Sequence, residues 1–447
     1  MFDMVVIGAG PGGYSCAIRA AQLGARVCII EKNGMGGTCT QRGCIPTKYL
    51  HSLGDIVRRT AAAKRYGINA RIQLDFNLIR SRMVSTISKL GYGIEMLLKS
   101  NDIDIVPGDA HIVSQNEIAV NNGSSSIETR NIVIATGSYP TSLNGHPFKN
   151  NILSTTSVLE LQTIPKSIIV VGGGYSGCEF ASILSALGSK VYLVEAEKNL
   201  LPSLPNEVGN TIEKYMRIDG IDVITNSKVD KITDTGAIVN TKEIEASNLL
   251  VCIGRKPNII EDELNLIGVS FNSRGIIVND KMQTNVDNVY AIGDVTGMYE
   301  LAHVASKQGE VVAENIMGMG SSMDYRAVPV CVFTYPEIAF VGQLSGEKIG
   351  VFPLTASAKA SCLGESRGFV RVYDEGGIIV GVLIIAPHAG EMIGEAALAV
   401  RMNMKIEDVQ DTIHAHPTLP ESFLEAVRDV NNIAIHLPSK GRKSIMI

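Results

Sequence analysis

The chain has 447 residues, of which 45% are hydrophobic and 19% are charged. This length exceeds one ordinary hydrophobic core, so about two to four domains are expected. The formal net charge of −5 gives no electrostatic footprint for nucleic acid. No stretch approaches the roughly 18 uninterrupted apolar residues of a membrane helix. The composition therefore predicts a well-buried protein that binds neither nucleic acid nor membrane.

The start of the chain and its cysteines indicate the compartment. The chain enters a predicted strand at residues 4–7 without a basic leader or an Arg-rich presequence, so no targeting peptide is expected. Of the eight cysteines, six lie scattered in apolar or glycine-rich surroundings, as is typical of small buried side chains. This usage predicts a reducing, cytoplasmic setting in which at most one pair, Cys39 and Cys44, is catalytic.

A strand, a helix and a second strand are expected over residues 4–31. The first turn carries Gly8, Gly10 and Gly13, which would permit a tight turn, approach to a pyrophosphate and close helix–strand packing, respectively. The helix N-terminus offers free N–H groups to the phosphates, and Glu31 is placed to accept from ribose hydroxyls. The motif predicts a dinucleotide site. The alternative is a glycine-rich turn with a surface glutamate.

The two central cysteines, Cys39 and Cys44, are separated by four residues. A disulfide needs Cα atoms roughly 4.4–6.8 Å apart, whereas residues five apart in a straight helix rise about 7.5 Å. We therefore expect Cys39 in a bent loop and Cys44 at the start of a helix over 43–59, where the helix N-terminus favours a thiolate. A zinc site and two buried thiols without function are the alternatives; zinc would need two more ligands, and His414 and His416 are distant in sequence.

A long amphipathic helix is predicted over 76–99, followed by short strands between 103 and 135. The last of these strands runs into Thr136 and Gly137, and a proline-marked linker follows over 139–166.

The opening pattern repeats from residue 168, with Gly172, Gly174 and Gly177 in the turn and Glu195 at the end of the second strand. We call the turn Gly8–Gly13 with Glu31 the first cradle, and the turn Gly172–Gly177 with Glu195 the second cradle. Two dinucleotide cradles in one chain imply two nucleotides, one held permanently and one exchanged. An acid at position 195 favours a free 2′-hydroxyl and repels a 2′-phosphate, so the second cradle predicts NAD rather than NADP.

Short strands return over 221–251 and lead to Gly254. Asp294 later follows a buried apolar run, where an unpaired carboxylate would be costly. We therefore expect Asp294 to meet a hydroxyl or an N–H group. The alternative is a role as N-cap of the helix that starts near Leu301.

The last third of the chain, residues 326–447, changes character. An antiparallel sheet is predicted from strands at 328–333, 338–341, 368–373 and 378–386. Helices are predicted at about 389–402, 406–413 and 421–430.

The segment between the last two of these helices carries a candidate base. His416 precedes a proline that fixes the local backbone, and Glu421 follows five residues later. A histidine oriented by a carboxylate is the base–orienter pair of acid–base catalysis. The alternative is a surface histidine beside a helix-capping glutamate, and His414 is interpreted as structural.

Two stretches resemble one known family. GGTCTQRGCIPTK, residues 36–48, resembles the redox-active segment of the pyridine nucleotide–disulfide oxidoreductases, and HAHPTLPE, residues 414–421, resembles their C-terminal active-site segment. The order of motifs matches over essentially the whole chain. The resemblance implies an α/β fold with two Rossmann-like dinucleotide-binding domains and a C-terminal α+β dimerisation domain that contains an antiparallel sheet. The implied domains are an FAD-binding domain at 1–147 completed by 268–322, an NAD-binding domain at 148–267, and an interface domain at 326–447.

The resemblance also implies roles for individual residues. FAD would lie on the first cradle, with Asp294 on its ribityl chain, and NAD would lie on the second. Cys39 would exchange with substrate, and Cys44 would face the flavin as a charge-transfer thiolate. Lys48 and Glu179 would form an ion pair near the flavin ring, and Tyr175 would act as a lid between flavin and nicotinamide. The remaining cofactor-binding residues would be Thr136, Gly137 and Gly254.

His416 and Glu421 would serve the active site of a partner subunit, which makes a homodimer obligatory for activity. Within the family, the sequence is most similar to the branch that oxidises dihydrolipoyl groups with NAD⁺. A reduced lipoyl dithiol would attack the Cys39–Cys44 disulfide, and electrons would pass through FAD to NAD⁺. The implied partner is the lipoyl domain of a 2-oxo acid dehydrogenase or glycine-cleavage complex. The alternatives are an NADPH-dependent reductase of a small disulfide and a catalytically inactive flavoprotein binding subunit.

Overall fold

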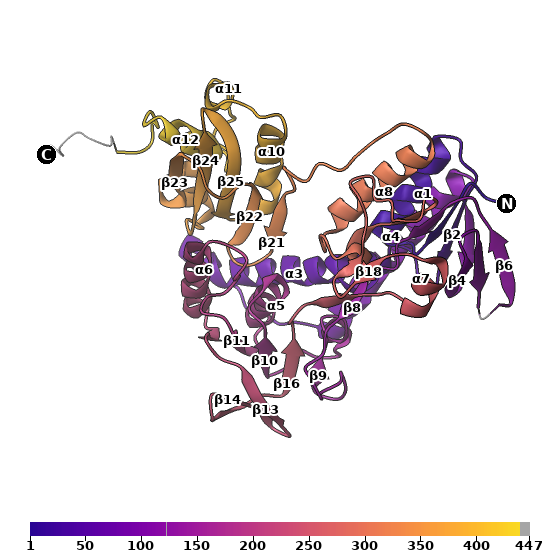
Figure 1. The fold of residues 1–447 in the computed structure, drawn as a ribbon. Coiled ribbons are helices and arrows are strands. Elements are labelled where there is room, and N and C mark those ends of the chain that lie inside the picture. The colour runs from indigo at the N-terminus through magenta and orange to yellow at the C-terminus, as the bar shows by residue number, and fades with distance from the viewer. Residues whose placement is uncertain (122, 439–447) are drawn as a thin grey trace, which may run out of the picture. The chain divides into compact units, whose positions relative to one another are not determined.

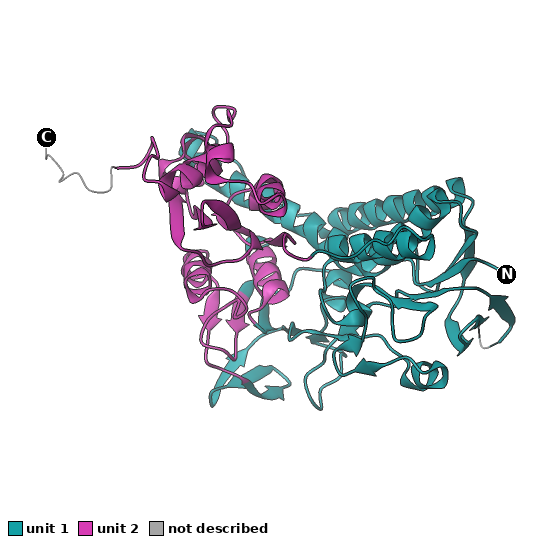
Figure 2. Ribbon diagram, turned by 45° about the horizontal axis from the view of Figure 1, so that its top comes forward, with its two compact units in different colours: residues 1–172, 186–190, 229–324 teal, residues 173–185, 191–228, 325–447 magenta. Residues whose placement is uncertain are grey.

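The structure, a computed structural model, describes residues 1–121 and 123–438 (Figure 1). The chain divides into two compact units (Figure 2). The first contains residues 1–172, 186–190 and 229–324, and the second contains residues 173–185, 191–228 and 325–447. The last nine residues of the predicted interface domain lie outside the described part of the chain.

A five-stranded parallel sheet forms the centre of the first unit. Its strand order is β20-β7-β1-β2-β3, with β1 at Met4–Ile7, β2 at Val27–Glu31, β3 at Asp104–Pro107, β7 at Ile132–Ile134 and β20 at Val289–Ala291. All four residues of β1 are buried, and alternate residues enter two different apolar clusters. Burial on both faces explains why these strands are continuous apolar runs.

Helices cover one face of this sheet, and a small antiparallel sheet and a short helix cover the other. The helices are α1 (Pro11–Gln22), α4 (Phe76–Ser100) and α8 (Ala302–Ile316). The other face packs against β4 (Ala110–Ser114), β5 (Glu117–Val120), β6 (Ser125–Glu128) and α7 (Glu261–Ile267). Helices α1 and α8 approach closely at Gly12 and Gly309, where a side chain on Gly309 would collide with the Gly12 carbonyl oxygen.

The long helix α4 confirms the helix predicted over 76–99. Its apolar periodicity sets its length, and its start is fixed by Asp75, whose side chain accepts a hydrogen bond from the backbone N–H of Leu78 at 3.0 Å. Among the described residues, no helix combines the length and apolar character needed to span a bilayer.

The second nucleotide-binding motif forms another five-stranded sheet, in the order β12-β11-β10-β16-β9. Its elements are β9 (Ile152–Leu153), β10 (Ser167–Val171), α5 (Tyr175–Ala186), β11 (Lys190–Val194), α6 (Asn206–Ile218), β12 (Asp222–Ile224) and β16 (Asn248–Val251). A three-stranded antiparallel sheet of β13 (Val229–Thr233), β14 (Gly236–Val239) and β15 (Lys242–Glu245) is inserted before β16.

A short antiparallel ribbon positions the residues that follow the first parallel sheet. It pairs β8 (Ser138–Pro140) with β17 (Arg255–Pro257), so segments far apart in sequence lie side by side. The short 3₁₀ helix η3 (Gly293–Thr296) follows β20.

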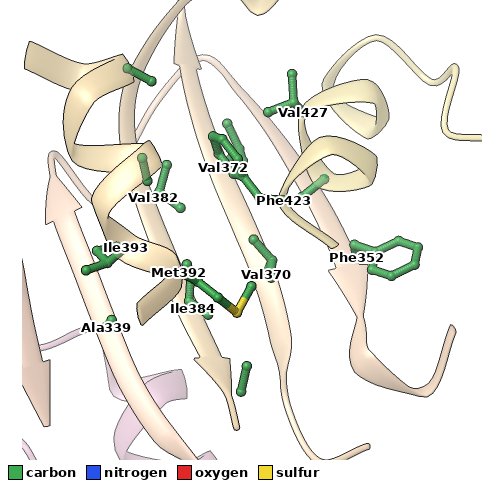
Figure 3. Packing of buried hydrophobic residues seen from close by; sticks show 14 of the residues in the cluster. Ala339, Phe352, Val370, Val372, Val382, Ile384, Met392, Ile393, Phe423 and Val427 are labelled. Carbon is green, nitrogen blue, oxygen red and sulfur yellow. The ribbon is translucent and has the colours of Figure 1, made fainter. Parts of the chain in front are cut away.

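The C-terminal part of the second unit contains the predicted antiparallel sheet, with strand order β21-β22-β25-β24-β23. Its strands are β21 (Val330–Val332), β22 (Glu337–Gly342), β23 (Lys348–Pro353), β24 (Phe369–Glu375) and β25 (Ile378–Ala386). Figure 3 shows its core, where Val372 and Ile384 of the sheet meet Met392 of α10 (Ala389–Arg401) and Phe423 of α12 (Glu421–Val430).

The predicted fold class is confirmed, but several local assignments differ. Strand β23 is absent from the prediction, because it carries Gly350 and Pro353, residue types that are depleted in strands. Helix α9 (Ala358–Leu363) is also absent from the prediction. Helix α11 (Ile406–Gln410) is shorter than predicted. The apolar run GIIV at residues 275–278 predicts a strand, but the structure forms only the two-residue strand β19 (Gly275–Ile276) there.

Candidate active site

Both cysteines of the redox-like segment lie in helices, which corrects the prediction of a loop at Cys39. Cys39 lies in α2 (Gly37–Arg42), and Cys44 is the first residue of α3 (Cys44–Ala62), as predicted. Gly43 separates the two helices with φ −143° and ψ −104°. The backbone break at this glycine lets two helical cysteines approach each other, so no loop at Cys39 is required.

The two cysteines are thiols in hydrogen-bonding contact. Cys39 is half-buried and Cys44 is exposed. The pKa of Cys39 is raised above its ordinary value, first by its hydrogen bond with Cys44 and then by burial, while the nearby charge of Lys48 acts in the opposite direction. The contact with Cys44 and the burial therefore both favour the protonated thiol at Cys39.

In the first cradle, the protein leaves no space for a side chain at Gly8 and Gly13 but leaves space at Gly10. A side chain on Gly8, whose φ is +105°, would place Cβ 2.5 Å from the Ala135 carbonyl oxygen, and a side chain on Gly13 would collide with the Gly8 carbonyl. A Cβ on Gly10 would meet no protein atom within 4 Å. The backbone at Gly10 therefore faces open space, which is what a pyrophosphate requires.

Glu31 and the cysteine segment complete the first cradle. Glu31 Oε2 accepts a hydrogen bond from the Ala9 N–H at 2.7 Å, and Oε1 accepts one from the Asn33 N–H at 2.7 Å. The Gly36 N–H donates to the Ala9 carbonyl at 2.9 Å. The thiol pair is thus anchored directly on the glycine turn, and the residues present fit a bound FAD.

The second cradle repeats this geometry. Glu195 is buried, and its two oxygens accept from the backbone N–H groups of Gly173 at 2.5 Å and Glu197 at 2.7 Å. A side chain on Gly172 would collide with the Cys252 carbonyl, whereas a Cβ on Gly174 would meet no protein atom within 4 Å.

The first turn of α5 follows directly from the second cradle. Gly177 is buried within it. Tyr175 begins the helix, and its hydroxyl accepts a hydrogen bond from Ser203 Oγ at 3.0 Å. The residues of the second cradle fit a bound NAD.

The predicted residues Thr136, Gly137 and Gly254 meet at the β8–β17 ribbon. Thr136 Oγ1 donates to the Asn258 carbonyl at 2.7 Å, and the Gly137 carbonyl accepts from the Asn258 N–H at 2.8 Å. The Gly254 carbonyl accepts from the Thr141 N–H at 3.0 Å. Both glycines have positive φ, 70° at Gly137 and 109° at Gly254, so these turns favour residues without a side chain.

Asp294 is half-buried and meets a hydroxyl, as predicted. Ser138 Oγ donates to Asp294 Oδ2 at 2.5 Å. The alternative role of Asp294 as N-cap of the next helix is wrong, because α8 begins after Leu301. Ser138 and Arg255 are absent from the sequence-based site, although each directly follows a predicted glycine of the ribbon.

His416 and Glu421 are brought together at the start of α12. His416 Nδ1 lies 2.8 Å from Glu421 Oε1, and the Thr418 N–H donates to Oε2 at 2.7 Å. Burial acts to raise the pKa of Glu421, but the hydrogen bonds from Thr418 and His416 outweigh it and hold that pKa below its usual value. The His416 side chain is 69% exposed, so its Nε2 is available to a substrate.

The neighbouring histidine has a different environment. His414 Nε2 lies 2.9 Å from Glu395 Oε1, and the His414 side chain is only 6% exposed. This contact supports the structural role interpreted from the sequence.

Glu179 and Lys48 are placed in different units. Glu179 lies on α5 and is buried, and its Oε1 accepts from the Phe333 N–H at 3.0 Å. Lys48 lies in the second turn of α3. The ion pair between them stays a prediction. Within residues 1–121 and 123–438, no group of three or more His, Cys, Asp or Glu side chains is arranged to hold a metal ion.

Comparisons with known proteins agree with this geometry. The family model described as pyridine nucleotide-disulphide oxidoreductase matches residues 2–309, and the model of the family's dimerisation domain matches residues 328–427. The chain is 40% identical to a dihydrolipoyl dehydrogenase of Geobacillus stearothermophilus, covering 98% of each protein. It is 39% identical to one of Chlamydia pneumoniae, covering 98% of this chain and 99% of the relative.

Two solved structures are also similar. LpdA from Mycobacterium tuberculosis has a TM-score of 0.89 at 27% identity, covering 95% of this chain and 99% of the other. The HOCl-induced flavoprotein disulfide reductase RclA from Escherichia coli has a TM-score of 0.84 at 25% identity, covering 96% of this chain and 99% of the other.

Proposed function

Because the chain belongs to the pyridine nucleotide-disulphide oxidoreductase family, we propose that it oxidises protein-bound dihydrolipoyl groups with NAD⁺, as a dihydrolipoyl dehydrogenase does. The observation that carries the proposal is the thiol pair, Cys39 and Cys44, in hydrogen-bonding contact and anchored on the first glycine cradle. The acid at Glu195 in the second cradle supports NAD⁺ as the acceptor.

The proposed cofactor sites follow from the two cradles. FAD is held by the Gly8–Gly13 turn, Glu31, the β8–β17 ribbon and Asp294, and NAD is held by the Gly172–Gly177 turn and Glu195. FAD, when bound, supplies the two-electron carrier between the thiol pair and NAD⁺. We assign the FAD-binding domain to residues 1–147 and 268–322, and the NAD-binding domain to 148–267.

The thiol chemistry is a two-step exchange. One substrate thiolate attacks Sγ of Cys39, the S–S bond to Cys44 breaks, and Cys44 leaves as a thiolate. The second substrate thiol then attacks the substrate sulfur of the mixed disulfide, which releases oxidised lipoyl group and reduced Cys39. The two substrate protons end on Cys39 and His416. The raised pKa of Cys39 supports the proton on that residue.

His416 is the proposed base for this exchange. Its Nδ1 bonds to Glu421, which leaves Nε2 to take the substrate proton. The C-terminal part of the chain is a dimerisation domain. We place His416 of one subunit at the thiol pair of the other, so that the homodimer is the active form.

The proposed partner is the lipoyl domain of a 2-oxo acid dehydrogenase or glycine-cleavage complex, because such domains carry the dithiol that this chemistry consumes. The proposed setting is the cytoplasm, because the cysteine usage suits a reducing compartment.

The test is a steady-state assay of the purified holoenzyme. We expect turnover of dihydrolipoamide with NAD⁺, little turnover with NADP⁺, and loss of both in Cys39→Ser and Cys44→Ser variants that still bind FAD. A Cys362→Ser variant is the matched control, because Cys362 is an exposed cysteine outside the segment. A Cys44→Ser variant with full dihydrolipoamide turnover would disprove the mechanism and favour an inactive binding subunit.

A second candidate is an NADPH-dependent reductase of a small disulfide. The structural similarity to the flavoprotein disulfide reductase RclA favours this candidate. Its signature is oxidation of NADPH by glutathione disulfide, with no reaction between dihydrolipoamide and NAD⁺. The buried Glu195 argues against it, because a carboxylate at that position repels a 2′-phosphate.

A further inference from the structure

Three side chains form a chain of polar contacts beside the first cradle. Arg255 Nε donates to Ser138 Oγ at 2.7 Å, and Ser138 Oγ donates to Asp294 Oδ2 at 2.5 Å. Arg255 also binds the Ser138 carbonyl through Nη2 at 2.7 Å. The three residues come from β17, β8 and η3, three segments that are remote from one another in sequence.

The direction of every hydrogen bond in this chain is fixed. A guanidinium has only donors, so the Ser138 oxygen must accept from Arg255, and its single hydrogen must then point to Asp294. Asp294 Oδ2 is therefore engaged by Ser138. Among residues 1–121 and 123–438, Asp294 Oδ1 has no hydrogen-bond partner, and the Asp294 side chain is 25% exposed.

Arg255 also balances the charge of this site. Its Nε lies 3.8 Å from Asp294 Oδ2. A second carboxyl, Glu300, interacts electrostatically with Asp294 and Arg255. Its pKa is raised by burial first and then by Asp294, and Arg255 acts in the opposite direction. One guanidinium thus faces two carboxyl groups, and its loss would leave two like charges together.

The site is also connected to the redox pair, because Asp294 contributes to the raised pKa of Cys39. The open oxygen of Asp294 belongs to the same unit as the thiols and the first cradle. A hydroxyl donor on a bound FAD would suit the acceptor oxygen Oδ1 of Asp294.

We propose that Arg255 and Ser138 are positioning residues that hold Asp294 by Oδ2 and so turn Oδ1 toward a hydroxyl of FAD. This inference rests on the proposed role of Asp294 in FAD binding. Without the Ser138 hydroxyl, the Asp294 carboxylate is free to turn toward Arg255 and form a direct ion pair, which removes Oδ1 from the cofactor. Without Arg255, Ser138 loses the donor that orients it.

The test measures FAD affinity of the full chain by reconstitution of apoprotein, followed by flavin fluorescence. We expect Ser138→Ala and Arg255→Gln each to weaken FAD binding about tenfold, in the range of one lost charge-assisted hydrogen bond. Ser138→Thr, which keeps the hydroxyl, should restore most of the affinity. The double variant should be no weaker than the worse single variant, because both residues act through the same carboxylate.

The decisive arm repeats these substitutions in an Asp294→Ala background, with the melting temperature of each apoprotein as a folding control. If Ser138 and Arg255 act through Asp294, neither substitution weakens FAD binding further there. Equal losses with and without Asp294 would overturn the inference and leave the pair a role in the β8–β17 ribbon alone. Unchanged FAD affinity in Asp294→Ala itself would also overturn it. A failure of the proposed substrate chemistry would give a different result: the wild-type protein would retain FAD but would not turn over dihydrolipoamide.

Discussion

The Glu31 carboxylate accepts a hydrogen bond from the backbone N–H of Ala9, with 2.7 Å between Oε2 and the nitrogen. Glu195 makes the same contact with Gly173 in the second cradle. In both cradles the other carboxylate oxygen accepts from the N–H two residues later in the chain. Each acid is therefore fixed by its own glycine turn before any nucleotide binds, and each oxygen keeps a second lone pair for a ribose hydroxyl.

The open space beside Gly10 and Gly174 predicts that binding of FAD and binding of NAD⁺ can be weakened independently. Because a Cβ on Gly10 or Gly174 meets no protein atom, Gly10→Ala and Gly174→Ala should fold normally. The added methyl group would occupy space that the proposed pyrophosphate needs. We expect Gly10→Ala to lose FAD, and Gly174→Ala to keep FAD while its KM for NAD⁺ rises at least about tenfold. Flavin absorbance and steady-state kinetics measure the two effects.

Gly8→Ala is the matched control for this experiment. Its Cβ would lie 2.5 Å from the Ala135 carbonyl oxygen at a φ of +105°, so the apoprotein itself should be destabilised, by about 1–3 kcal/mol or more. Equal apoprotein stability losses in Gly8→Ala and Gly10→Ala would contradict the distinction between a closed and an open glycine.

Glu195 predicts the nucleotide preference. A buried carboxylate at the ribose position should hold the ratio of kcat/KM for NAD⁺ over NADP⁺ at about 100 or above, and Glu195→Gln should lower that ratio by about tenfold or more. Glu197→Gln is the control. Glu197 lies two residues after Glu195 and is exposed, so this variant removes the same charge without changing the ribose position. A ratio that changes equally in both variants would mean that general surface charge sets the preference.

The His416–Glu421 pair predicts a graded loss of activity. Removal of the base in His416→Gln should lower kcat by about 10²–10⁴-fold. Glu421→Gln keeps the base but weakens its orienter, so a loss of about tenfold is expected. His414→Gln should have a small effect, because His414 is enclosed and bonded to Glu395. A larger loss from His414→Gln than from His416→Gln would reverse the assignment of the base.

The lowered pKa of Glu421 predicts a pH dependence of stability. A carboxyl whose folded pKa lies below its unfolded value stabilises the fold at all pH values above the unfolded pKa, and this stabilisation is lost as the pH falls through the folded pKa. The melting temperature of wild type should exceed that of Glu421→Gln near neutral pH. The difference should shrink below the ordinary titration range of glutamate. A difference that is constant down to strongly acidic pH would contradict this origin.

The parts of the site that sequence predicts are those governed by local rules. Each glycine turn, its acid and the helix that follows occur within about thirty residues, and their spacing carries the chemistry. The same holds for His416 and Glu421, which are five residues apart.

The Arg255–Ser138–Asp294 chain lies beyond such rules. Its members are separated by 117 and 156 residues. The pairing of β8 with β17 brings Arg255 to Ser138, and the pairing of β20 with β7 places the segment that contains Asp294. Spacing alone does not predict the helical conformation of Cys39, because two cysteines five positions apart in one straight helix lie too far apart for a disulfide. A break at one residue, Gly43, satisfies the same distance with two helices.

The hydrogen bond from Ser203 to Tyr175 leads to a prediction about nucleotide entry. Tyr175 directly follows Gly174, the open glycine of the NAD cradle, and its hydroxyl is held by the exposed Ser203 at 3.0 Å. If Tyr175 acts as the lid that the family resemblance implies, it must leave this partner when the nicotinamide binds. Ser203→Ala should then tighten NAD⁺ binding by about twofold to fivefold, the value of one exposed hydrogen bond.

Tyr175→Phe provides the second arm, because it removes the same hydrogen bond from the other side and keeps the ring. Both single variants and the double variant should bind NAD⁺ with the same affinity if the bond alone opposes entry. Titration of NAD⁺ into the holoenzyme by calorimetry measures all four proteins under one condition. Unchanged affinity in Ser203→Ala would show that the Ser203–Tyr175 contact is already broken in solution, or that Tyr175 does not move when the nucleotide binds.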